Sequence, residues 1–66
     1  MVFSQIFGII RSMVSIDAPN IVNYQEAKEI CRQKGYSDYF FNDCSKQYEE
    51  AKVWSVNSDR TIMTFY

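Results

Sequence analysis

The side chains that could carry out chemistry are few, and their types exclude most catalytic mechanisms. The 66 residues contain no histidine, which removes the usual general base, the usual zinc ligand and any cysteine–histidine nucleophile pair. The two thiols, Cys31 and Cys44, have no imidazole to complete a metal site. We therefore expect a protein that is not an enzyme and that holds neither a metal nor a cofactor.

The two cysteines allow two interpretations. Cys31 lies four positions before Gly35 and Cys44 nine positions after it, on the apolar faces of two predicted helices. We favour buried free thiols, since a buried cysteine is an ordinary small core residue. The alternative is a redox-sensitive disulfide between them. Reduced thiols, and a first segment that lacks the features of a secretory signal or a membrane span, predict a cytoplasmic protein.

The charge distribution argues against nucleic acid and membrane partners. Lys plus Arg (7) nearly balance Asp plus Glu (8), for a net charge of −1, and the cations are spread along the chain instead of clustering as phosphate binding requires. The apolar half of residues 2–16 faces a polar half with one cation, Arg11, whereas helices on membrane surfaces usually carry several. An alternative basic patch would draw on Lys28, Arg32, Lys34 and Arg60.

The elements that must position these residues begin with an amphipathic segment at residues 2–16. At about 100° per residue, its apolar side chains fall within one half of a helical wheel. They are Val2, Phe3, Ile6, Phe7, Ile9, Ile10, Met13, Val14 and Ile16. We predict a helix, with a strand over residues 4–16 as the alternative because the composition also suits a sheet. Residues 15–22, which contain Pro19, predict a connector.

Two further helices have local start and stop signals. Asn23 with Glu26 three residues later predicts an N-cap, and Gly35 predicts the end of that helix. Ser37 caps a third helix that runs to Lys52 and that turns one apolar face inward. That face holds Phe40, Phe41, Cys44, Tyr48 and Ala51.

From Val53 the periodicity changes from 3.6 to 2, which predicts a β-hairpin around Ser58 and Asp59. If Val56 pairs with Thr61, one face holds Trp54, Val56, Met63 and Phe65. The predicted fold is therefore a single α+β domain over residues 1–66, with three helices followed by a C-terminal antiparallel β-hairpin. This order resembles that of winged-helix domains, in which the third helix enters the DNA major groove.

The aromatic side chains suggest a binding surface. Eleven Phe, Tyr and Trp residues exceed what so small a core encloses, and such side chains anchor protein interfaces. The last strand is predicted as an unprotected sheet edge that could pair with a second copy, so we expect a homodimer. The candidate partner-binding residues are Tyr36, Tyr39, Asp43, Lys46, Glu50, Ile62, Thr64 and Tyr66.

These features favour a small non-enzymatic protein–protein interaction module with a protein partner of unknown identity. An inhibitor or regulatory adaptor of phage or viral origin would suit so short a chain. The alternative is a winged-helix-like regulator that binds nucleic acid.

Overall fold

The computed structural model describes residues 2–66; Met1 and the side chain of Val2, which the helical wheel placed on the apolar side, lie outside the described part. The N-terminal segment is a helix, as predicted, but α1 covers only Val2–Arg11. The strand alternative is therefore wrong. Beyond Arg11 the chain tightens, since the Met13 N–H donates to the Ile10 carbonyl at 3.0 Å and the Ser12 Oγ donates to the Ile9 carbonyl at 2.7 Å. Ile16, which the helical wheel placed on the apolar half of the predicted helix, lies beyond α1 and is 98% exposed, so that part of the prediction is wrong.

Helix α2, Tyr24–Gln33, confirms both of its predicted boundaries. The side chain of Asn23 accepts a hydrogen bond from the Glu26 N–H at 2.9 Å, as an N-cap does. Gly35 has a φ of +99°, the left-handed conformation that ends helices and that glycine adopts without steric cost. The two helices that follow the first are therefore joined by a tight turn.

Helix α3, Asp38–Glu50, begins where predicted and ends two residues early. The Ser37 Oγ accepts from the Phe40 N–H at 3.2 Å. Phe41 and Cys44 are buried, but Phe40 is 46% exposed, so its predicted place on the buried face is wrong. Phe41, Cys44 and Ser45 occupy the centre of that face, and Phe40 lies to one side of it.

The sheet has three strands where a two-stranded hairpin is predicted. β1 (Ile21–Asn23) begins in the predicted connector and ends at the predicted N-cap, β2 is Trp54–Val56 and β3 is Ile62–Phe65. All pairs are antiparallel, and β3 is the central strand of the order β1-β3-β2. The prediction that the last strand is a free edge is therefore wrong, because β1 covers the side on which a second copy was expected to pair.

The hairpin register differs from the predicted one by two residues. Val56 pairs with Met63, not with Thr61. A shift of two keeps every side chain on its face, so Trp54, Met63 and Phe65 are buried as predicted. The opposite face of β3 is exposed at Ile62 and Thr64.

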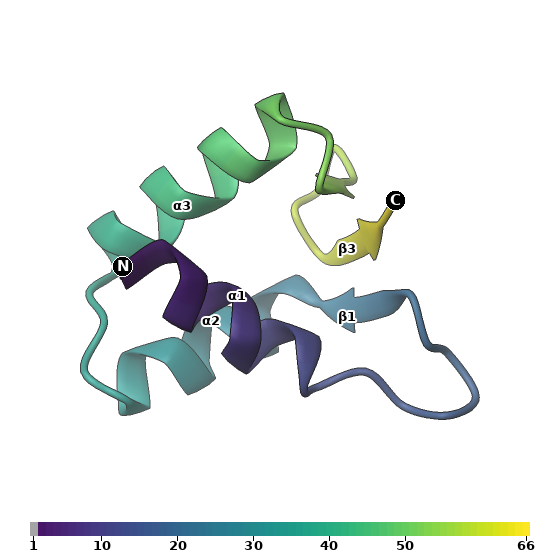
Figure 1. Ribbon diagram of the computed structural model, residues 1–66, viewed down its shortest axis with the longest axis horizontal. Helices are drawn as coiled ribbons and strands as arrows, with labels where there is room; N and C mark the ends of the chain where they lie inside the picture. Colours follow the sequence, from purple (N-terminus) through teal and green to yellow (C-terminus); the bar gives the residue numbers. More distant parts are fainter. Residues whose placement is uncertain (1) are drawn as a thin grey trace.

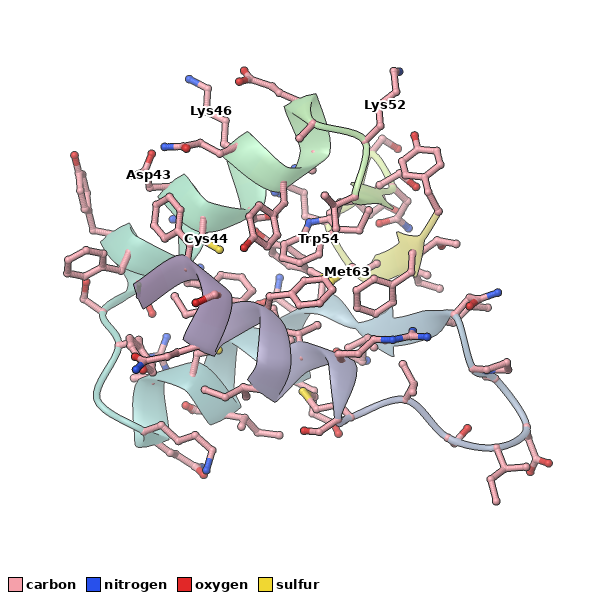
Figure 2. The ribbon with its side chains drawn as sticks, in the orientation of Figure 1. Asp43, Cys44, Lys46, Lys52, Trp54 and Met63 are labelled. Atoms are coloured by element: carbon pink, nitrogen blue, oxygen red, sulfur yellow. The ribbon has the colours of Figure 1, made fainter. Side chains whose placement is uncertain are left out.

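The helices cover one face of the sheet, and the core lies between the helices and the sheet (Figure 1). Figure 2 shows Cys44 and Trp54 in the space between α1 and α3. The buried side chains are Ile6, Ile10, Val22, Tyr24, Ala27, Cys31, Phe41, Cys44, Trp54, Met63 and Phe65. The α+β class is confirmed, and the elements follow one another in the order α1-β1-α2-α3-β2-β3.

Candidate functional site

A groove of about 620 Å³ lies between α2 and α3. At one end, Arg60 of the β2–β3 loop spans from Tyr24 on α2 to Glu49 on α3. Most of the side chains that line it are polar or charged. They are Tyr24, Gln25, Lys28, Asn42, Lys46, Glu49, Glu50 and Arg60. Because α2 and α3 are consecutive helices joined by the Gly35 turn, the local stop and cap signals in the sequence set the geometry of this groove.

Arg60 lies at one end of the groove and is held on three sides. Its Nη2 donates to Glu49 Oε2 and to the Tyr24 hydroxyl, both at 2.9 Å. Its guanidinium lies 4.8 Å from the centre of the Tyr24 ring, in cation–π geometry, and Gln25 Nε2 donates to its carbonyl at 3.1 Å. Its φ of +55° is a left-handed conformation that a non-glycine residue rarely adopts. These contacts offset that strain and fix the guanidinium.

A buried polar chain continues from Glu49 into the core. Ser45 Oγ donates to Glu49 Oε2 at 2.6 Å and accepts from Trp54 Nε1 at 3.2 Å. Burial by itself raises the pKa of Glu49, but the hydrogen bonds from Arg60 and Ser45, with the Arg60 charge, outweigh it and hold this pKa below its ordinary value. Glu49 is therefore a carboxylate at neutral pH, and it neutralises much of the Arg60 charge.

Each helix contributes one amide and one ammonium group to the lining of the groove. α2 contributes Gln25 and Lys28, and α3 contributes Asn42 and Lys46. Neither lysine forms a salt bridge with another described residue. These groups donate hydrogen bonds to anions or carbonyl oxygens, and the amides also accept them.

The predicted site residues fall into separate regions. Asp43, Lys46 and Glu50 line a shallow hollow on α3, and Figure 2 shows Asp43 and Lys46 on the side of α3 that faces away from α1. Tyr39, predicted on the polar side of this helix, is 79% exposed. Tyr36 instead donates its hydroxyl to Gln5 of α1 at 2.7 Å.

The remaining predicted site residues belong to the sheet. Ile62 and Thr64 are exposed on the outer face of β3, and Tyr66 follows that strand and is 74% exposed. Their role as partner-binding residues stays a prediction. The sequence reasoning missed Tyr24, Gln25, Asn42 and Glu49 and placed Arg60 only in the alternative basic patch. The available sequence signal for Arg60 was the predicted hairpin turn at residues 57–60. Tight hairpin turns need a positive φ, and because this turn has no glycine, another of its residues must adopt it.

The thiols do not form the alternative disulfide. Cys31 and Cys44 are buried and free. Burial raises the pKa of Cys44 to about 11, with smaller effects from Cys31 and Asp43. Within residues 2–66, no three His, Cys, Asp or Glu side chains are placed to hold a metal ion.

The length and hydropathy of the helices bear on membrane insertion. None of the helices in the described part of the chain is both long and apolar enough to span a bilayer.

The chain resembles part of known replication proteins. No family model matches it. It is 42% identical over 60 residues to the DNA replication licensing factors mcm7-B and mcm7-A of Xenopus laevis, and 40% identical over 60 residues to mcm7 of Xenopus tropicalis. Each match covers 91% of this chain, which spans 8% of the relative's length.

These relatives overturn the function expected from the sequence. The inhibitor or adaptor of phage or viral origin is wrong, because a match over nearly the whole chain leads to replication factors of a vertebrate. The expectation that nucleic acid is not a partner has no support either, since the relatives are named for DNA replication. The expectation of a small viral inhibitor rested on the short chain and its lack of catalytic side chains. Both features are equally expected of a segment that resembles a small part of a large protein.

Proposed function

We propose that this chain acts in DNA replication licensing, the process for which its relatives are named. The observation that supports this proposal is 42% identity maintained over 91% of the chain. The fold adds to it, because residues 2–66 enclose a continuous core between three helices and a sheet. Such a unit can serve as one module of a larger protein.

The proposed role is non-catalytic. The absence of histidine from the sequence leaves the chain without the usual general base, and the groove between α2 and α3 presents amides and ammonium groups in place of a nucleophile with its base. The proposal retains a protein partner. It replaces the predicted cytoplasmic location with the compartment in which DNA is replicated.

A chimeric protein tests the proposal. The segment of Xenopus laevis mcm7-B that matches this chain is exchanged for the 60 matched residues, and the chimera is added to an egg extract depleted of endogenous mcm7. DNA synthesis and recovery of the chimera on chromatin are measured. We expect both to come close to the levels obtained with the wild-type factor.

Two further variants make the result decisive. Deletion of the segment, and the chimera with Trp54→Ala, which removes the largest fully buried side chain, should each reduce DNA synthesis. Equal DNA synthesis with the deletion variant would show that the segment has no part in licensing. A soluble chimera that loads poorly, beside a wild-type factor that loads well, would equally contradict the proposal.

A further inference from the structure

The groove between α2 and α3 is a positive hollow on a chain whose net charge is negative. Its lining holds three cations, Lys28, Lys46 and Arg60, and two carboxylates, Glu49 and Glu50. The whole chain carries a net charge of −1. Because Arg60 and Glu49 neutralise each other at 2.9 Å, the charges left to attract a ligand are the two lysines, opposed by Glu50.

The other cations of the predicted basic patch do not join this groove. Arg32 is paired with Glu29 and with Asp38, both at 3.0 Å, and the hydrogen bond from Arg32 holds the pKa of Asp38 below its ordinary value. Lys34 is absent from the groove lining. Within the groove lining, the cations that form no salt bridge with a described residue are therefore Lys28 on one wall and Lys46 on the other.

The surroundings of the groove favour separate carboxylates over a phosphate backbone. Duplex DNA carries one negative charge per ~1.7 Å of its axis, so a protein that follows it needs a tract of cations. Here Asp43 and Glu50 line the adjacent hollow together with Lys46 and would repel such a continuous anion. An extended peptide with spaced acidic side chains avoids this repulsion, and its carbonyl and N–H groups can bond to the amides of Gln25 and Asn42.

We propose that the α2–α3 groove binds an acidic peptide segment of a partner protein, with Lys28 and Lys46 pairing with its carboxylates and Gln25 and Asn42 with its backbone. Arg60, held by Tyr24 and Glu49, lies at one end of the groove, where its charge is largely neutralised. The groove is present whether or not the chain acts in licensing, so this inference goes beyond the proposed function and is tested separately.

The probe is a fluorescein-labelled decapeptide of alternating Glu and Ser, and fluorescence anisotropy with the full 66-residue chain measures binding at low and at physiological salt. Each of Lys28→Gln and Lys46→Gln should weaken binding about threefold, as expected for an exposed ion pair, and the double variant should weaken it by about tenfold. Lys34→Gln and Lys52→Gln, which remove the same charge elsewhere, should change affinity less than twofold.

Nuclear magnetic resonance locates the bound peptide. We expect the probe to shift the side-chain amide signals of Gln25 and Asn42, and a Gln–Ser decapeptide not to shift them. Equal weakening by all four lysine variants would overturn the proposal, because it would show general charge attraction. No detectable binding, or tighter binding of a 20-base-pair duplex in the same groove than of the Glu–Ser peptide, would also overturn it. The chimera test above can fail while the peptide binds, and the reverse, so the two proposals are distinguishable.

Discussion

Arg60 and Tyr24, which are 36 positions apart, form one contact that ties the β2–β3 loop to the first turn of α2. The Arg60 guanidinium donates to the Tyr24 hydroxyl at 2.9 Å and lies 4.8 Å from the centre of its ring. The same guanidinium pairs with Glu49 near the end of α3. One side chain in a strained backbone conformation thus links three elements that the chain brings together only on folding.

Substitutions at Arg60 separate the value of these contacts from the cost of the backbone strain. Arg60→Ala should lower the free energy of unfolding by about 2 kcal/mol, because it breaks a partly buried polar network and keeps the positive φ. Arg60→Gly breaks the same network but removes the strain, so it should be about 1 kcal/mol more stable than the alanine variant. Urea unfolding, followed by the fluorescence of Trp54, the single tryptophan, measures both.

Lys52 provides the matched control. It has a φ of +60°, and its side chain makes no salt bridge with a described residue. Lys52→Gly should therefore be stabilising, by up to about 1 kcal/mol. If glycine and alanine had the same effect at Arg60, the assignment of strain to this position would be contradicted.

The Glu49 carboxylate makes stability depend on pH in the acidic range. Its pKa is lower in the folded chain than its ordinary value, since hydrogen bonds from Arg60 and Ser45 outweigh the effect of burial. A lowered pKa contributes stability that is complete above the unfolded pKa, near 4.5, and that is lost as the pH falls through the folded pKa. We therefore expect the urea concentration at the unfolding midpoint to decrease as the pH is lowered below about 4.5.

Glu49→Gln should make this acidic decline shallower, at the cost of lower stability at pH 7. Glu50→Gln is the comparison, because Glu50 lines the same groove and its carboxylate makes no salt bridge with another described residue. An identical acidic decline in the wild type and in Glu49→Gln would show that another group is responsible. Asp38, whose pKa is lowered by the hydrogen bond from Arg32, would be the next residue to test.

The features that the sequence predicted correctly are those set by neighbouring residues. The caps at Asn23 and Ser37 act over three positions, and Gly35 acts through its own φ, so residue types alone reveal them. β1 was missed because a three-residue strand has no measurable periodicity. It exists because Val22 pairs with Met63, 41 positions away, and that pairing also moves β3 from the predicted edge to the centre.

The same distinction applies to the candidate site. Lys46 and Glu50 were predicted to be exposed on α3 because helical spacing places them there, and they do line the groove. The opposite wall and the Arg60 end were not predictable, since Tyr24, Glu49 and Arg60 meet only through tertiary contacts. Helical spacing identifies the exposed face of one helix, but it does not show which residues of other elements lie opposite that face.

The buried thiols should react slowly in the folded chain. With the pKa of Cys44 raised to about 11 by burial, roughly one thiol in a thousand is a thiolate at pH 8. Burial also raises the pKa of Cys31. We expect alkylation by iodoacetamide at pH 8 to be about 100-fold slower than in concentrated urea. Fast labelling of the folded chain, or a mass two hydrogens lower without reductant, would contradict buried free thiols.

The two glycines of the chain should respond in opposite ways to the same substitution. Gly35→Ala should lower the free energy of unfolding by at least about 1 kcal/mol, because the φ of +99° is strained for alanine. Gly8→Ala lies within α1 and should raise stability by up to about 1 kcal/mol, since alanine is the better helix former. A Cβ at either position meets no atom within 4 Å, so steric clashes do not confound the comparison. Thermal and urea unfolding of both variants measure the effect, and destabilisation by both substitutions would contradict the backbone explanation.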